Sequence, residues 1–354
     1  MVFNVIPVRE TSGFGNRLSV YWYGRSISFW EQKGFEMPQQ MRDNWIGSYQ
    51  TTFLPYLPMR TLYTSNWNNS TDENLSDSAT LLFKEKLKKL GVSFELIYEM
   101  RYPHSSAFLL TFYNRYFLPI LRQDTRKAIA EYFQSKNNSD VKTIHNESLS
   151  SKNSIIAIHF RCGDILFGHE LYHFMTLNYY LHIFDQILAE MNSNSTTELN
   201  IYIISQLSTN GVHRHSDQVN LPSCRRLVSA FRDKLHEHYA NHHVNLTFQL
   251  INNNIVSDFN LMMHVPYLIC GTSTFCLHAA IAGNNLRSFL PDIGPWSFLS
   301  QHVNETIQSE ILPPTHSIIN VSLNKWFLES TLVFKKKWHK SNKFSNLIDY
   351  ILSH

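Results

Sequence analysis

The feature that most constrains the fold is an alternation, between residues 155 and 290, of short apolar runs with helical segments. The helical segments are roughly ten to fifteen residues long, as in repeated strand–helix units. This alternation predicts a parallel, doubly wound α/β sheet. The expected strands are 155–160, 200–205, 244–251, 267–270 and 286–290, and the expected helices are 179–191, 224–239, a helix starting near 258, and 273–282.

The amino-terminal part shows a weaker form of the same pattern. An apolar run at 3–8 predicts a strand, and a loop containing Gly13 and Gly15 follows it. Aromatic and aliphatic residues then recur at helical spacing over 19–33, up to a helix C-cap at Gly34. Further helices are expected at 78–90 and 110–133.

The segment 135–153 is polar and poor in apolar residues, so it is the predicted domain boundary. It divides the chain into two domains, 1–150 and 151–354, and the second ends in a largely helical stretch at 326–352. A chain of 354 residues, 43% of them hydrophobic, is large enough to form a core in each domain.

The charge balance and the hydropathy exclude some partners. The 31 basic and 28 acidic side chains leave a net charge of +3, so no overall field favours nucleic acid or a membrane surface. No apolar run approaches the roughly 20 residues that a transmembrane helix needs. The chain starts without the basic and apolar regions of a signal peptide. On these grounds a cytoplasmic location stays open.

The four cysteines lack C-x-x-C spacing and are too few for a disulfide scaffold. One bridge among Cys162, Cys224, Cys270 and Cys276 is possible, and the redox compartment stays undecided. Nine Asn-x-Ser/Thr sequons also occur. About half of them are expected by chance in a chain this rich in asparagine, and the rest favour a luminal setting.

The strand expected at 155–160 delivers a polar cluster to its carboxyl end, where ligands bind in open α/β sheets. His159 and Arg161 stand two residues apart and are expected to point to the same side. Gly163 permits a tight turn that brings Asp164 back toward them. A guanidinium matches a phosphate with its rigid fork, so Arg161 is a candidate phosphate ligand. The alternative is a structural ion pair between Arg161 and Asp164.

A zinc site is a second alternative for this stretch, which is rich in residues that bind metals. The residues His159, Cys162, Asp164, His169 and His173 lie close in sequence. Their spacing fits none of the common zinc patterns, so no metal is expected.

Two further stretches carry candidate ligand groups. Ser257 or Asp258 could cap a helix, and Asp258 could equally accept two N–H bonds from a guanine edge. Ser273 and Thr274, between a strand and a helix, could combine hydroxyls with free backbone N–H groups to hold an anion. Both are also ordinary helix caps.

The glycine loop near the amino terminus is a third candidate anion site, because Gly13 and Gly15 allow close approach of a ligand. A dinucleotide fingerprint requires a third glycine where Leu18 stands, which argues against NAD. A purely structural tight turn stays open as an alternative.

Taken in order, these stretches resemble the motifs of GDP-fucose-dependent fucosyltransferases. The segment 258–290, with Asp258-Phe-x-Leu, Gly-Thr-x-Thr-Phe and Ala-Ala-x-x-Ala-Gly, resembles the third conserved motif of the galactoside α-1,2-fucosyltransferases. His159-Phe-Arg161-Cys-Gly-Asp164 is similar to the His-x-Arg-Arg-Gly-Asp motif shared with the α-1,6- and protein O-fucosyltransferases. Gly13-Phe-Gly15-Asn16-Arg17 is similar to their Gly-x-x-Gly-Asn loop, in the form of the plant xyloglucan enzymes.

The resemblance implies a GT-B fold, in which two Rossmann-like domains face a cleft and the carboxy-terminal one binds the donor. It implies inverting, metal-independent and cofactor-free transfer of L-fucose from GDP-fucose to a hydroxyl of a glycan or glycoprotein acceptor, in the Golgi or secretory-pathway lumen. A transferase for another nucleotide sugar and a non-catalytic nucleotide-sugar-binding relative stay open as alternatives. Cys162 and Ile165 depart from the family's Arg and Tyr, and the family's membrane anchor is missing.

The resemblance also implies roles for single residues. Arg161 would hold the β-phosphate. Asp164 follows Arg161 by three positions, and this closeness suits it to orienting Arg161. Glu170, or failing that His169, would be the catalytic base. The remaining positions are donor contacts: His159 and Asp258 for the guanine, Ser273, Thr274 and Phe275 for the phosphate and its surroundings, and Gly13, Gly15, Asn16 and Arg17 for the donor from across the cleft.

Overall fold

The computed structural model describes most of the residues between 155 and 291, and fewer elsewhere. Within that range the gaps are 164, 166–173, 192–196, 206, 208–214, 243 and 253–254. Outside it the described residues are 2–4, 15, 18, 22, 34–36, 122, 123, 125, 126, 129, 130, 133, 318–321 and 352.

The chain divides into two compact units, one of 1–137 with 302–315 and one of 138–301 with 316–354. The predicted domain limits, 1–150 and 151–354, stay a prediction because the segment around the boundary lies outside the described residues.

Six parallel strands form the sheet of the second unit, in the order β5-β4-β3-β6-β7-β8. They are β3 (Ile155–His159), β4 (Thr197–Ile204), β5 (Val244–Ile251), β6 (Tyr267–Cys270), β7 (Arg287–Pro291) and β8 (Ile318–Val321). The first of these strands, β3, lies in the middle. The chain adds β4 and β5 on one side of it, then returns to place β6 on the other. This is the strand order of doubly wound, Rossmann-like domains, so the predicted parallel α/β sheet is confirmed.

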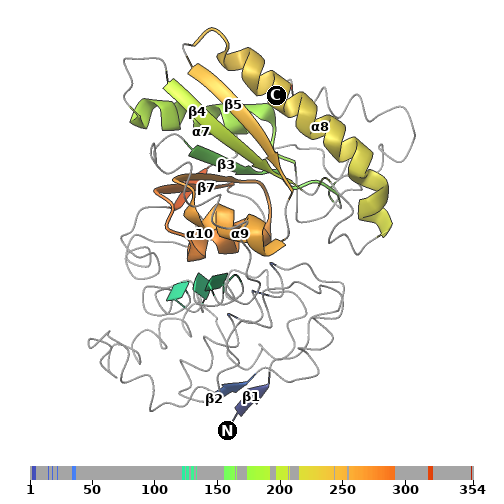
Figure 1. Ribbon diagram of the computed structural model, residues 1–354, viewed down its shortest axis with the longest axis vertical. Coiled ribbons are helices and arrows are strands. Elements are labelled where there is room, and N and C mark those ends of the chain that lie inside the picture. Colours follow the sequence, from blue (N-terminus) through green and yellow to red (C-terminus); the bar gives the residue numbers. More distant parts are fainter. Residues whose placement is uncertain are drawn as a thin grey trace, which may run out of the picture. The chain divides into compact units, whose positions relative to one another are not determined.

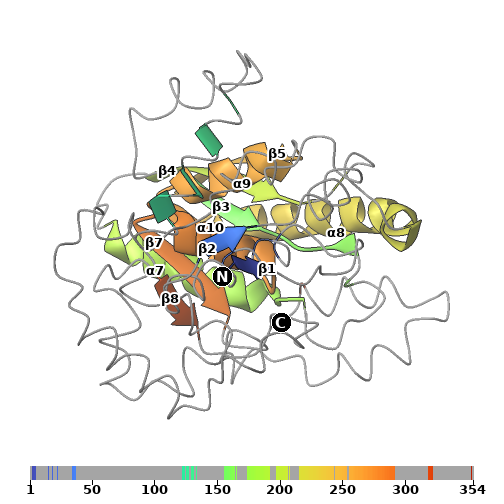
Figure 2. The ribbon, with the colours of Figure 1, turned by 90° about the horizontal axis from the view of Figure 1, so that it is seen from below.

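Four helices connect these strands: α7 (Leu177–Glu190), α8 (His215–Tyr239), α9 (Ile255–His264) and α10 (Thr274–Ala282). Figure 1 shows α7 and α8 over one face of the sheet and α9 and α10 over the other. Figure 2, turned by 90°, shows α9 and α10 again side by side. Helices on both faces explain why β3, in the centre, is buried at all five positions and has no polar residue before its end.

The two faces of β3 have different neighbours. Ile156, Ile158 and Phe160 belong to one core cluster with the inner sides of α7 and α8. The ring of Phe160 lies with its centroid 5.0 Å from that of Phe231 in α8. Each large apolar side chain buried in this way contributes about 1.5–3 kcal/mol to folding. Because side chains alternate along a strand, His159 points to the opposite face, toward α9 and α10.

Most predicted elements are confirmed, with bounds shifted by a few residues, but α8 starts nine residues before the predicted start at Cys224. The helix contains Pro222, which lacks an N–H and disfavours a helix interior. The sequence pattern therefore placed the helix start after this proline. The strand β8 was not predicted at all.

The start of α9 also differs from the prediction. Ser257 and Asp258 were considered as N-caps, but the helix begins at Ile255, so both lie in its first turn. Capping by either residue is therefore wrong.

The amino-terminal unit contains a parallel pair, β1 (Val2–Asn4) and β2 (Gly34–Glu36). Gly15, Leu18 and Trp22, between them in sequence, are helical and buried. A strand followed by a helix was predicted here, and both are present. Gly15 lies in the helix, although it was predicted in the loop before the helix. Gly34 lies in a strand that pairs with Val2, and was predicted as a helix cap.

Other predictions for the ends of the chain are tested in part or not at all. The described residues of 122–133 are helical, as expected for 110–133, and so is Leu352. The predicted helix 78–90 and the rest of 326–352 lie outside the described residues. Among the helices that the structure describes, none has the length and hydropathy to cross a membrane.

Candidate functional site

The loops after β3 and β6 start side by side in the middle of the sheet. His159, the last residue of β3, is in register with Cys270, the last residue of β6. Beyond this pair the backbone N–H of Gly271 donates a hydrogen bond of 3.1 Å to the carbonyl oxygen of His159. The chain leaves β3 and β6 toward opposite sides of the sheet, which makes this the topological switch point where doubly wound domains bind ligands.

The loop after β3 carries Arg161, which is half-buried. The strand ends at His159, so Arg161 lies beyond it. The alternation along a strand, which predicted a common side for His159 and Arg161, therefore does not extend to Arg161. The N–H of Phe160 still donates to Ile204 of β4 at 2.9 Å, which fixes the backbone before Arg161. Gly163 has a φ of 79°, a conformation that favours glycine and that a tight turn requires, while Asp164, which the turn was predicted to bring back, lies outside the described residues.

The loop after β6 leads directly into α10. Thr272, Ser273 and Thr274 are all buried, at 1%, 3% and 6% exposure. Ser273 is the N-cap residue of α10, yet its hydroxyl makes no capping hydrogen bond. The first N–H groups of a helix have no partner within the helix and carry a partial positive charge, so they bind anions. Three buried hydroxyl residues at such a terminus form a polar site suited to a phosphate.

His159 is the polar residue at the point where the two loops start. It is 8% exposed, and its Nδ1 has no hydrogen-bond partner. Burial, and then the positive charge of Arg161, lower the pKa of His159 from 6.5 to about 3. The imidazole is therefore neutral at physiological pH. A buried polar atom without a partner costs about 1–3 kcal/mol, so a ligand group that bonded this nitrogen would recover that free energy.

Aromatic rings connect His159 to both helices on its face of the sheet. Its ring centroid lies 5.7 Å from that of Phe275 in the first turn of α10. Phe275 in turn lies 5.4 Å from Phe259 of α9. Asp258, the candidate guanine ligand, immediately precedes Phe259 in the first turn of α9. A carboxylate there also stabilises the helix dipole, which accounts for Asp258 without a ligand.

The structure therefore brings several candidate residues to one place, and it leaves others untested. His159 ends β3 and Arg161 lies in the loop after it, while Ser273, Thr274 and Phe275 lie at the start of α10. Phe259, the residue after Asp258 in α9, lies against Phe275. The predicted residues Gly13, Asn16, Arg17, Asp164, His169 and Glu170 lie outside the described residues.

Sequence reasoning missed two residues at the strand ends. A side chain at Gly271 would place its Cβ 3.2 Å from the carbonyl oxygen of His159 and 3.9 Å from the amide nitrogen of Arg161, so glycine lets the loops approach each other. Ser205 follows β4, is 5% exposed, and its hydroxyl has no partner. The signal was available, because Ser205 ends an apolar strand just as His159 does.

The four cysteines form two disulfide bonds, Cys162–Cys224 and Cys270–Cys276, where the sequence had suggested at most one. Cys162 is therefore not available as the thiolate ligand of the alternative zinc site. In the part of the chain that the structure describes, no group of three or more histidine, cysteine, aspartate or glutamate residues could hold a metal ion.

Comparisons with known proteins add no assignment. No protein-family model, no curated protein and no solved structure matches the chain.

Proposed function

We propose that this protein binds a nucleoside diphosphate sugar at the switch point between β3 and β6 and transfers the sugar to an acceptor hydroxyl. The observation that carries the proposal is the juxtaposition of Arg161, the neutral buried His159 and the start of α10. At that start the hydroxyl of Ser273 makes no capping hydrogen bond. Together these groups provide one fixed positive charge, the positive end of a helix dipole and one imidazole nitrogen without a hydrogen-bond partner. This set suits a diphosphate joined to a base or sugar with hydrogen-bonding groups.

The same groups suit a leaving diphosphate. As the bond between sugar and phosphate breaks, negative charge grows on the phosphate oxygens, and donors already arranged around them stabilise the transition state. Arg161 and the first turn of α10 would supply this stabilisation without a bound cation. The acceptor hydroxyl must lose its proton as it attacks, and Glu170, or else His169, is the proposed base.

The proposed donor is GDP-fucose and the proposed acceptor a glycan, because the motifs at 13–17, 159–164 and 258–290 resemble those of the α-1,2-fucosyltransferases. The proposed arrangement of the whole enzyme is GT-B. A luminal site of action is supported by the two disulfide bonds, since such bonds persist in oxidising compartments. The sequon at Asn245 is exposed on β5 and is therefore accessible to a glycan.

The deciding experiment is a thermal-shift panel with GDP, UDP, CMP and NAD in the presence of a chelator. We expect GDP to raise the melting temperature and the other three to raise it less or not at all. A response to UDP or CMP alone would mean that the donor is a sugar linked to that nucleotide and not GDP-fucose. No response to any nucleotide would show that the proposed nucleotide site is wrong. Transfer from GDP-fucose to galactosides, measured beside GDP-fucose hydrolysis, then separates a transferase from a non-catalytic binder.

A further inference from the structure

All four cysteines of the chain are paired, and both bonds attach to the loops that meet at the switch point. Cys162 comes directly after Arg161. Cys270 ends β6, and Cys276 lies in the first turn of α10. Three of the four side chains are fully buried, and Cys162 is only 6% exposed. Each loop with candidate ligand groups is therefore covalently held.

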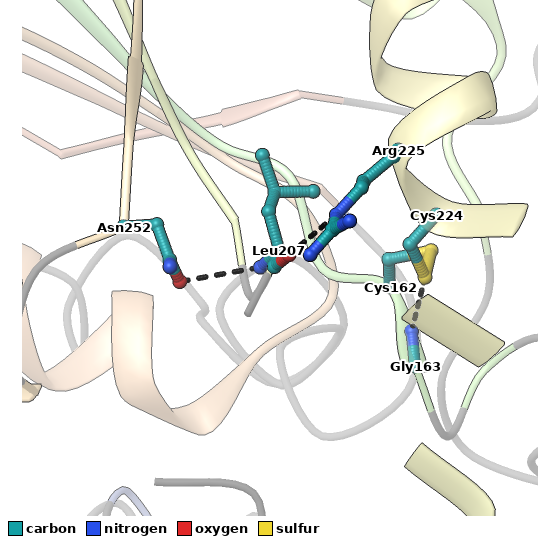
Figure 3. The surroundings of a disulfide bond; sticks show 6 residues. All are labelled: Cys162, Gly163, Leu207, Cys224, Arg225 and Asn252. Carbon is teal, nitrogen blue, oxygen red and sulfur yellow. Dashed lines mark hydrogen bonds between the residues drawn. A yellow bond between two sulfur atoms is a disulfide. The ribbon is translucent and has the colours of Figure 1, made fainter. Parts of the chain in front are cut away.

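The first bond ties the Arg161 loop to α8. Cys162 and Cys224 are 62 residues apart in sequence. The N–H of Gly163 donates to the sulfur of Cys224 at 2.9 Å, as Figure 3 shows. The covalent bond and the hydrogen bond both fix the tight turn in which Gly163 has its positive φ. This turn sets the direction in which the chain leaves Arg161.

Arg225, the residue after Cys224 in α8, connects the helix to the chain that follows the neighbouring strands β4 and β5. Arg225 donates from its Nε to the carbonyl oxygen of Leu207, after β4, at 2.7 Å. The N–H of Leu207 donates in turn to the Oδ1 of Asn252, at the end of β5, at 3.2 Å. Figure 3 shows these contacts beside the disulfide. One turn of α8 thus holds the loops at the carboxyl ends of β3, β4 and β5.

The second bond closes a ring around the start of α10. Cys270 and Cys276 are six residues apart, and the ring between them contains the residues Gly271 to Phe275. The carbonyl of Cys270 accepts a 2.8 Å hydrogen bond from the buried hydroxyl of Tyr179, which fixes the ring to α7. The proposed phosphate-binding loop is therefore a short covalent ring.

We propose that the four cysteines are positioning residues that make ligand binding at the switch point depend on oxidation. A dithiol would transfer two electrons and two protons to each disulfide, giving two cysteine thiols, and would itself become a disulfide. The Arg161 loop and the α10 start would then be free to move, while hydrogen bonds and the apolar core would keep the sheet folded. The effect on ligand affinity rests on the proposed function, but the effect on the loops does not.

The test compares the oxidised chain with the chain treated with dithiothreitol, by hydrogen exchange and by calorimetric titration with GDP. The amides of Gly163 and Leu277 report on the two loops, because they bond Cys224 Sγ and Ser273 O. The amide of Phe160, bonded to Ile204, reports on the sheet. We expect reduction to speed exchange at Gly163 and Leu277 by roughly tenfold or more beyond any rise at Phe160, whose exchange follows the stability of the whole domain.

We also expect GDP to bind the reduced chain roughly tenfold more weakly, and reoxidation to restore its affinity. The paired variants Cys162→Ala with Cys224→Ala, and Cys270→Ala with Cys276→Ala, should each reproduce the change at their own loop. A chain with all four substitutions should not respond to dithiothreitol.

Unchanged exchange at both loops after complete reduction would overturn the proposal, and so would an equal rise at Phe160, which indicates global unfolding. If the oxidised chain does not bind GDP, the proposed function fails, and the exchange data still decide whether the bonds position the loops.

Discussion

The two loops at the switch point are held in opposite ways. The loop after β3 is tied to a distant helix by a bond that spans 62 residues, and the loop after β6 is closed on its own helix by a bond that spans six. In the chain-entropy model a cross-link stabilises the fold more when it closes a longer loop. The first bond therefore contributes to the stability of the whole domain, and the second mainly sets local geometry.

The largest expected effect comes from removing the long-range bond. The change of Cys162→Ala with Cys224→Ala should lower the free energy of unfolding by about 4 kcal/mol, and Cys270→Ala with Cys276→Ala by about 2 kcal/mol. Urea denaturation of the oxidised variants measures both. Equal losses in the free energy of unfolding would show that the two disulfides stabilise the fold equally, contrary to the chain-entropy model.

The next effect concerns Arg161 itself. Arg161→Lys keeps the charge of the β3 loop but loses the fork that matches a phosphate. If the fork grips the leaving phosphate, turnover should fall roughly a hundredfold, equivalent to ~3 kcal/mol. The matched control is Arg232→Lys on the exposed side of α8. Full activity in both variants would mean that Arg161 only supports the loop.

A smaller effect concerns His159, which joins the two loops. Its pKa is about 3 in the folded protein and 6.5 ordinarily, so between these values the unfolded chain binds more protons. Stability from this group is therefore complete above pH 6.5 and is lost as the pH falls toward 3. At pH 5 the loss should reach about 2 kcal/mol relative to pH 7.

Denaturation of the wild type and of His159→Asn at both pH values measures this loss. The variant should lose less stability on acidification than the wild type. An unchanged pH dependence in His159→Asn would show that His159 titrates normally.

The smallest effect tests the contact between the loops. Gly271→Ala should destabilise by about 1 kcal/mol, because crowding against the backbone at 3.2 Å outweighs the entropy that alanine removes from the unfolded chain. Thermal unfolding measures the change. A stabilised variant would show that the two loops separate easily.

The sequence predicted the central architecture because the strands of a doubly wound sheet are short apolar runs with clear ends. The strands at Val244–Ile251 and Tyr267–Cys270 have the predicted bounds. The start of α8 was missed because local sequence argues against a helix around Pro222, and packing of the buried Cys224 and Leu227 overrides that preference.

The candidate site was predictable only in part, because its residues come from stretches that are far apart in the sequence. Motif spacing pointed to His159, Arg161 and Ser273, but it could not show that β3 and β6 are neighbours. The pairing of Cys162 with Cys224 depends on the same long-range arrangement and is invisible in local sequence. The assignments of Asp164 and Glu170 stay predictions.

The central position of β3 also affects how the protein is made. Its partner on one side, β6, is synthesised roughly 110 residues later, so one edge of a strand that is apolar up to its last residue emerges from the ribosome with no neighbour. At about 5–20 residues per second the wait lasts on the order of 10 s. During that interval the Ile155–His159 edge is open to pairing with other chains. This edge is protected only once β6 has been synthesised and has paired with it.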